Sequence, residues 1–98
     1  MYGIIYKAKN NINGNIYIGQ TIQSLNSRIS GHISNAFTGS IYHFHRAIRK
    51  YGKDNFMWEV IDEADTKEEL DMMEKFWIRV YDSYKGKGYN ETFGGVGE

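Results

Sequence analysis

The fold is decided by two runs near the amino terminus, YGIIYKA at residues 2–8 and NIYIG at residues 15–19. Both runs are rich in β-branched and aromatic residues, a composition typical of strands. The connection between them ends in Asn13-Gly14, a pair that favours a tight turn. The pattern therefore predicts a β-hairpin.

Helices are expected on the carboxyl-terminal side of this hairpin, with one further strand. Residues 24–37 form the first expected helix, and its apolar residues recur at helical spacing: Leu25, Ile29, Ile33, Ala36 and Phe37. Residues 41–50 form the second, which ends at Tyr51-Gly52 because Gly is a common helix stop. A strand over residues 56–61 precedes a helix over residues 66–82, which opens with a Thr66…Glu69 capping box. This order favours an α+β domain with a small sheet covered by helices.

The length of 98 residues and 11.4 kDa fits a single domain over residues 1–98. Apolar runs are too short for a membrane span or a signal peptide, so we expect no membrane partner. The absence of Cys excludes disulfides and thiolate chemistry, and it favours an intracellular, cytoplasmic location. The glycine-rich tail over residues 85–98 is expected to be a loop, in which a linker to another module could begin.

The formal net charge of zero conceals a strong segregation along the chain. Residues 1–53 contain seven Lys and Arg, all three His and no acidic residue, whereas residues 54–98 contain all 12 acidic residues. This asymmetry fits either a positive face that binds a polyanion or complementary charges within one domain. The charges alone do not separate these alternatives.

Glu74 is the most unusual residue of the expected third helix. At about 100° per residue, it lies among Leu70, Trp77, Ile78 and Tyr81, inside the stripe that should face the core. An unpaired buried carboxylate is costly, so Glu74 must meet a cation, a metal ion or several donors. A structural ion pair and a functional site both remain open, and we favour the functional site.

Arg28 and His32 are four residues apart and share a face of the first expected helix. An Arg there can hold a phosphate with two bonds, and a nearby His can exchange a proton near neutral pH. A solvated Arg and a satisfied core His would give the same spacing. Tyr6 and Tyr17 lie on adjacent strands, where cross-strand packing is the ordinary role.

A basic stretch with interleaved aromatic residues follows the first helix. It contains His43, His45, Arg46, Arg49 and Lys50, with Tyr42 and Phe44 between them. This composition suits phosphate contacts and also suits an exposed helix face. The three His lack acidic partners at metal-ligand spacing, so a zinc site is not expected.

Several short motifs occur here in the order found in the GIY-YIG nuclease family, which this sequence resembles over residues 2–95. They are Gly3-Ile4-Ile5-Tyr6, Tyr17-Ile18-Gly19, Arg28 with His32, Lys50-Tyr51-Gly52 with Asn55-Phe56, Glu74, and Gly88-Tyr89-Asn90. Gly3 is displaced by one residue from the usual triplet, whereas the spacing of the two tyrosines is kept. Among subgroups, the sequence most resembles catalytic domains of phage- and intron-encoded homing endonucleases.

The resemblance implies a three-stranded antiparallel sheet flanked by helices and a DNA endonuclease that uses one divalent ion. Glu74 would bind Mg²⁺, with Mn²⁺ as an alternative, and Arg28 would hold the scissile phosphate. Tyr6 would sit beside the attacking water, supported by Tyr17 and His32. Asn90 would position groups of the site, and we expect the DNA to contact His43, Arg46, Arg49 and Lys50.

Two questions stay open at the level of the sequence. A tyrosine has an ordinary pKa of about 10, so the general base could be Tyr6 or His32. The alternative function is a catalytically silent nucleic-acid-binding module of the same fold. Homing relatives usually carry a separate DNA-binding module, so this chain is either a lone catalytic module or a fragment of a longer protein with such a module. The resemblance is also compatible with a phage- or mobile-element-encoded protein. The sequence gives no indication of oligomeric state.

Overall fold

A computed structural model of the chain describes residues 1–85 and 88–94. The hairpin consists of β1 (Gly3–Asn10) and β2 (Ile16–Thr21), and β3 (Phe56–Ala64) pairs with the other side of β1. All pairings are antiparallel, and the strand order is β2-β1-β3. The predicted α+β fold with a three-stranded antiparallel sheet is therefore confirmed.

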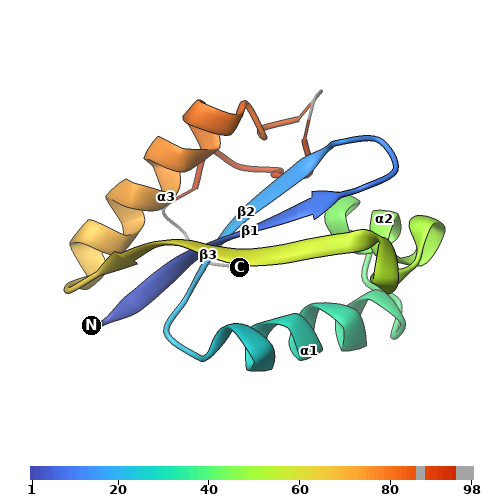
Figure 1. The fold of residues 1–98 in the computed structure, drawn as a ribbon, viewed down its shortest axis with the longest axis horizontal. Helices are drawn as coiled ribbons and strands as arrows, with labels where there is room; N and C mark the ends of the chain where they lie inside the picture. Colours follow the sequence, from blue (N-terminus) through green and yellow to red (C-terminus); the bar gives the residue numbers. More distant parts are fainter. Residues whose placement is uncertain (86–87, 95–98) are drawn as a thin grey trace.

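Three α-helices cover the two faces of this sheet. Helix α3 (Lys67–Tyr81) packs on one face, and helices α1 (Leu25–Ala36) and α2 (His43–Tyr51) lie on the other (Figure 1). A short 3₁₀ helix, η1 (Lys53–Asn55), connects α2 to β3. Each face of the sheet therefore contributes to its own apolar core.

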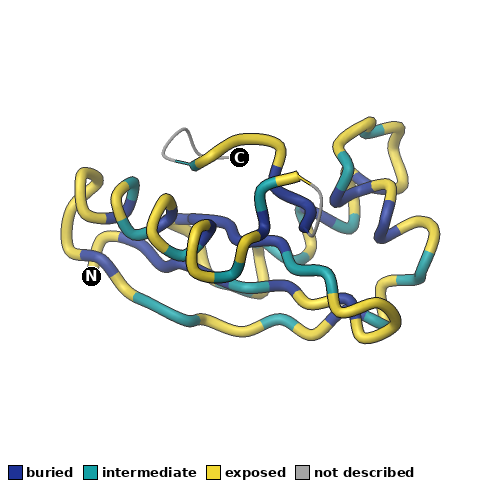
Figure 2. Tube along the Cα trace, turned by 90° about the horizontal axis from the view of Figure 1, so that it is seen from above, coloured by how far each residue is buried: buried dark blue, intermediate teal, exposed yellow. Residues whose placement is uncertain are grey.

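The two cores follow from the alternation of side chains along the strands. Ile5 and Ile18 face α3, in a cluster with Leu70 and Ile78. Their neighbours in sequence, Tyr6 and Tyr17, face α1 and α2, where they pack in the second cluster with Phe44 and Ile48. Figure 2 shows the resulting buried segments running along the strands, with exposed residues on the outer sides of the helices.

The third strand is longer than the sequence predicts, because it continues to Ala64 instead of ending at Ile61. Its register against β1 shifts between Ile5, which pairs with Asp62, and Tyr6, which pairs with Val60. Ile61 is therefore the extra residue of a β-bulge. The alternation of apolar and polar residues along β3 is interrupted at this bulge. The strand pattern that the sequence shows therefore ends at Ile61, although the strand itself continues to Ala64.

Helix boundaries are close to the prediction, with two local differences. Helix α2 begins at His43, because Tyr42 has an extended backbone at the N-cap position. Phe37, assigned to the apolar stripe of α1, is the C-cap and is 59% exposed. The predicted cap of α3 is confirmed: the Thr66 hydroxyl accepts a hydrogen bond from the Glu69 amide at 3.1 Å.

Candidate active site

The candidate site lies at the edge strand β2, where Gly19 pairs with Tyr6 of β1. A Cβ atom at residue 19 would collide with the hydroxyl and ring of Tyr6. Glycine is thus the residue that allows the Tyr6 side chain to cross this strand. The Tyr6 side chain is fully buried there, with 0% exposure.

A chain of hydrogen bonds runs from Tyr6 through two histidines. The Tyr6 hydroxyl lies 2.6 Å from Nε2 of His32 on α1, and Nδ1 of His32 lies 2.7 Å from Nε2 of His45 on α2. Nδ1 of His45 then lies 2.6 Å from Oγ of Ser40. The sequence showed His45 only as part of a basic stretch, because its contact with His32 depends on how α1 packs against α2.

Aromatic rings enclose His32 on several sides. The centre of its ring lies 5.4 Å from that of Tyr17, 5.1 Å from that of Phe44 and 5.8 Å from that of Trp58. This burial lowers the pKa of His32 to about 3, and the nearby positive charge of Arg28 acts in the same direction. His32 is therefore neutral at pH 7, whereas an ordinary histidine would titrate close to that pH.

Tyr6 has a perturbed pKa for a related reason. Burial raises its pKa to about 12, which outweighs the opposing effects of the Arg28 charge and of hydrogen bonds with Arg28 and Tyr17. The negative charge of Glu74 adds a smaller increase. Tyr6, Tyr17, Arg28 and His32 therefore form one cluster, which Glu74 influences electrostatically. The phenol of Tyr6 is protonated at neutral pH.

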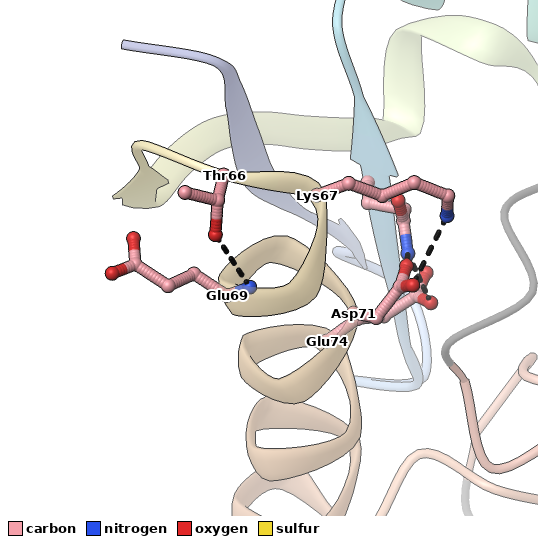
Figure 3. A network of polar contacts seen from close by, with 6 residues as sticks. Thr66, Lys67, Glu69, Asp71 and Glu74 are labelled. Atoms are coloured by element: carbon pink, nitrogen blue, oxygen red, sulfur yellow. Dashed lines mark hydrogen bonds and ion pairs between the residues drawn. The ribbon is translucent and has the colours of Figure 1, made fainter.

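Glu74 is buried on the inner side of α3, with 3% exposure, as its place in the apolar stripe predicts. Its Oε1 accepts a hydrogen bond at 3.0 Å from Nε2 of Gln20, and the same nitrogen donates to Asp71 at 2.9 Å. Lys67 forms an ion pair with Asp71 at 3.0 Å (Figure 3). Gln20 is thus a further residue of the site. Asp71 precedes Glu74 by three residues, a spacing that places both carboxylates on one face of α3, so the sequence did contain a signal for Asp71.

Asn90 fastens the chain after α3 to the middle of β2. Its Oδ1 accepts a hydrogen bond from the Ile18 amide at 2.9 Å, and its Nδ2 donates to the Ile18 carbonyl at 2.7 Å. Ser83 also donates to Oδ1, at 2.7 Å. The amide of Asn90 therefore holds the backbone between Tyr17 and Gly19.

The segment after α3, which the sequence predicts to be a glycine-rich loop from Lys85, makes defined contacts with β2. Gly88 forms a parallel bridge with Ile16, and both Tyr89 and Asn90 are buried. The described part of this segment contains no helix or strand, so it is a loop, and the hydrogen bonds of Asn90 with the Ile18 backbone anchor it to β2 in a way that the sequence does not reveal. The last part of the expected linker, residues 95–98, and residues 86–87 lie outside the described residues.

All four expected DNA-contacting residues lie on α2, and three of them line one pocket. His43, Arg46 and Lys50 line a pocket of about 280 Å³, whose other walls are formed by Asn13, Asn15, Ala47, Tyr51 and Tyr89. Arg49 is not among them. Its Nη1 donates to the carbonyls of Ala36 and Ser40 at 2.6 and 2.7 Å, which ties α2 to the end of α1.

A second, smaller cavity of about 100 Å³ opens beside the histidine pair. Arg28, His32 and His45 line it, together with Tyr17, Asn35, Tyr42, Phe44, Tyr89 and Glu91. Tyr89 borders both pockets, so the basic residues of the α2 pocket and the Tyr6 cluster are neighbours. Within residues 1–85 and 88–94, no three His, Asp or Glu side chains are grouped as metal ligands.

The sheet with its three helices and the site at β2 define a known class of catalytic domain. A family model described as the GIY-YIG catalytic domain matches residues 2–90, so this chain belongs to the GIY-YIG family. Membership and fold support a nuclease activity. None of the helices described by the structure is long and apolar enough to cross a membrane.

Individual relatives point in the same direction. The chain is 34% identical over 98 residues to "Putative endonuclease segE" of Enterobacteria phage T4, covering 99% of this chain and 44% of that protein. It is 33% identical over 81 residues to "Putative MSV199 domain-containing protein 146R" of Invertebrate iridescent virus 6, covering 81% and 33%. The chain therefore spans less than half the length of these two relatives.

Solved structures show the same architecture. Two structures of the catalytic domain of the homing endonuclease I-TevI, one of them a mutant, align with TM-scores of 0.78 and 0.79 at 26% identity. The alignments cover 92% and 94% of this chain and 98% and 95% of those chains. The likeness thus extends over the whole domain.

Proposed function

We propose that this domain is a divalent-metal-dependent DNA endonuclease that hydrolyses a phosphodiester bond at the β2 edge. The observation that carries this proposal is the buried Glu74 carboxylate, which acts electrostatically on Tyr6, a member of the cluster with Arg28 and His32. A buried carboxylate is costly for a binding module, which gains nothing from it. Family membership and the likeness to I-TevI support the same activity.

Glu74 is the residue that would hold the metal ion. Its carboxylate oxygens are the hard ligands that Mg²⁺ and Mn²⁺ prefer, and the Nε2 of Gln20 beside them holds one of these oxygens in place. The donor set therefore fits a hard divalent ion and not zinc. When bound, such an ion would stabilise the charge that develops on the phosphate and on the leaving oxygen.

Arg28 is placed to bind the scissile phosphate. It is half-buried on α1, lines the small cavity and forms a hydrogen bond with Tyr6. A planar guanidinium can form two parallel bonds with phosphate oxygens. When DNA enters, Arg28 would turn from Tyr6 to the phosphate, and the oxygen of Tyr6 would become available to a water molecule.

Tyr6 would then orient the attacking water and receive its proton. Because Arg28 and Tyr17 donate to its oxygen, its own hydroxyl would donate to His32 Nε2, and an oxygen lone pair would face the space that Arg28 leaves. His32, held in place by the aromatic rings, fixes the direction of this hydroxyl. Tyr17 would support the same network through its hydrogen bond with Tyr6.

The pocket on α2 is the proposed contact for the flanking DNA backbone. Arg46 and Lys50 supply positive charge, and His43 adds a donor or an acceptor. Because these residues read no base edge in the proposed arrangement, we expect weak and salt-sensitive binding with little sequence preference. A further DNA-binding module in a longer protein would then supply specificity.

Incubation of supercoiled plasmid with the protein tests this function. We expect nicked or linear product in Mg²⁺ and none after addition of EDTA. DNA binding without cleavage in Mg²⁺ or Mn²⁺ would instead favour a catalytically silent binding module.

A further inference from the structure

The hydrogen-bond chain from Tyr6 does not end at His32, and the proposed chemistry uses only its first two members. Beyond His32 it continues through His45 to Ser40, with each donor–acceptor distance between 2.6 and 2.7 Å. Tyr6, His32 and His45 are all buried, whereas Ser40 is partly exposed. The chain therefore connects a buried hydroxyl to the protein surface.

We propose that His45 acts through His32 as a positioning residue that relays the proton of the attacking water from Tyr6 to Ser40 and the solvent. This inference rests on the proposed nuclease function, because the water and the phosphate are those of that reaction. His45 does not contact DNA in it. Its contribution is to fix the tautomer of His32 and to complete the exit route.

Each proton moves by one position along the chain. The water gives a proton to Oη of Tyr6 as its oxygen bonds to phosphorus, and the original Tyr6 hydroxyl proton passes to Nε2 of His32. The bond from phosphorus to the leaving oxygen breaks in the same step, and the leaving oxygen takes a proton from solvent. The Nδ1 proton of His32 passes to Nε2 of His45, and the Nδ1 proton of His45 passes to Oγ of Ser40. Ser40 releases its own hydroxyl proton to solvent, and no residue changes its net charge.

The chain resets in the opposite direction. A proton from solvent enters at Ser40, both imidazoles return to their first tautomers, and Tyr6 releases a proton to a water molecule that replaces the product. Oγ of Ser40 can form the required hydrogen bonds in both tautomeric states of the chain. It also accepts a hydrogen bond from the Tyr42 amide at 3.3 Å, and one further hydrogen-bonding position of the hydroxyl is left for solvent.

The electrostatics favour this concerted route over a charged intermediate. Burial raises the pKa of Tyr6 to about 12 and lowers the pKa of His32 to about 3, so neither phenolate nor imidazolium is accessible at neutral pH. Burial and the charges of Arg28 and Arg49 also lower the pKa of His45, while Glu91 opposes them. A relay in which every member stays neutral avoids both unfavourable ions.

Single-turnover cleavage in Mg²⁺ and DNA affinity in Ca²⁺ test the relay. His45→Gln keeps a hydrogen-bonding side chain but cannot exchange tautomers, so we expect a rate loss of about 10²-fold, the usual scale for a proton-transfer group, with unchanged affinity. In the double variant with His32→Gln, the loss should not exceed that of His32→Gln alone, because the two residues act as one unit.

Imidazole provides a readout that a purely structural role would not change. His45→Gly opens space onto the small cavity, and added imidazole should restore the cleavage rate with saturation. Full activity of His45→Gln, or additive losses in the double variant, would overturn the relay.

Nitrogen NMR of the unmodified protein tests the chain without cleavage. We expect His32 and His45 both neutral at pH 7, with scalar coupling across the hydrogen bond between them. A charged imidazole at either position would contradict the proposal even in an active nuclease. If the two are neutral and coupled but no DNA is cut under any condition, the proposed function has failed and the relay with it.

Discussion

At the scale of single residues, burial and charge act against each other at Tyr6. Burial favours the neutral phenol, and Arg28 only partly offsets this effect. The hydroxyl is therefore suited to receive and pass on a proton while remaining protonated. Its chemistry depends on its neighbours more than on its own acidity.

Tyr6→Phe should separate this chemical role from packing. The ring stays in the core, so DNA affinity in Ca²⁺ and stability should change little. The single-turnover rate in Mg²⁺ should fall by about 10²-fold or more, because the oxygen that receives the water proton is lost. Cleavage at the parent rate would reduce Tyr6 to a cross-strand packing residue.

DNA affinity and cleavage rate should depend on the planar shape of the Arg28 guanidinium as well as on its positive charge. Arg28→Ala should lose both DNA affinity and rate, whereas Arg28→Lys should recover affinity better than rate, since an ammonium lacks the bidentate fork. Measurement of both quantities for each variant checks this. Equal recovery of rate and affinity by Lys would show that charge alone suffices.

The sequence was enough to predict a site residue where the chemistry of that residue conflicts with its neighbours in the sequence pattern. Glu74 stands out because a carboxylate interrupts an apolar stripe, and the structure buries it there. His45 and Gln20 could not be found this way, since neither conflicts with its local pattern. Their contacts, with His32 and Glu74, depend on packing between elements distant in sequence.

At the scale of elements, side chains from several elements meet at the edge strand β2. Gly19 admits the Tyr6 ring, Gln20 reaches Glu74, and the Ile18 backbone is clamped by Asn90. The hairpin itself could be predicted from its composition and its Asn-Gly turn. The bulge at Ile61 and the docking of residues 88–90 could not, because both depend on backbone pairing with a partner strand.

Two glycine substitutions should have opposite effects on stability. Gly19→Ala places a methyl group against the Tyr6 ring, in a core that tolerates overpacking poorly, so it should destabilise by about 1–3 kcal/mol. Gly31→Ala in α1 meets its nearest atom, in Arg28, at an ordinary 3.8 Å, and should stabilise by up to about 1 kcal/mol. Urea unfolding of both variants provides the comparison. A neutral Gly19→Ala would show that Tyr6 has room to move.

At the scale of the whole molecule, the basic residues of the first half of the chain occur in two different structural settings. Lys7 of the basic part pairs with Glu59 at 2.8 Å across β1 and β3, which is complementarity within the domain. Arg46 and Lys50 instead gather at the pocket on α2, where they remain exposed. Complementarity within the domain therefore holds for Lys7, while a face that binds a polyanion stays a prediction for Arg46 and Lys50.

Global stability should depend on pH through the buried histidines. Because the pKa of His32 is about 3 in the folded protein and about 6.5 when unfolded, the unfolded chain binds an extra proton between these values. Stability should therefore be full above pH 6.5 and fall on acidification, by about 1.4 kcal/mol per pH unit for a fully shifted histidine. The lowered pKa of His45 acts in the same direction.

Urea unfolding from pH 7.5 to pH 5 measures this dependence. His32→Gln should show a shallower decline than the parent protein, since one of the two shifted groups is gone. A flat profile, or greater stability at pH 5, would mean that the histidines are charged in the folded state.

The central claim, a nuclease centre organised around Glu74, is tested most directly by single-turnover plasmid cleavage with Glu74→Gln. This variant keeps the size of the side chain and can still form a hydrogen bond with Gln20, so circular dichroism and DNA affinity in EDTA should match those of the parent. The account predicts that the parent protein nicks DNA in Mg²⁺ and that Glu74→Gln loses this activity at every Mg²⁺ and Mn²⁺ concentration tried. Cleavage by Glu74→Gln at the parent rate in Mg²⁺ would contradict the account.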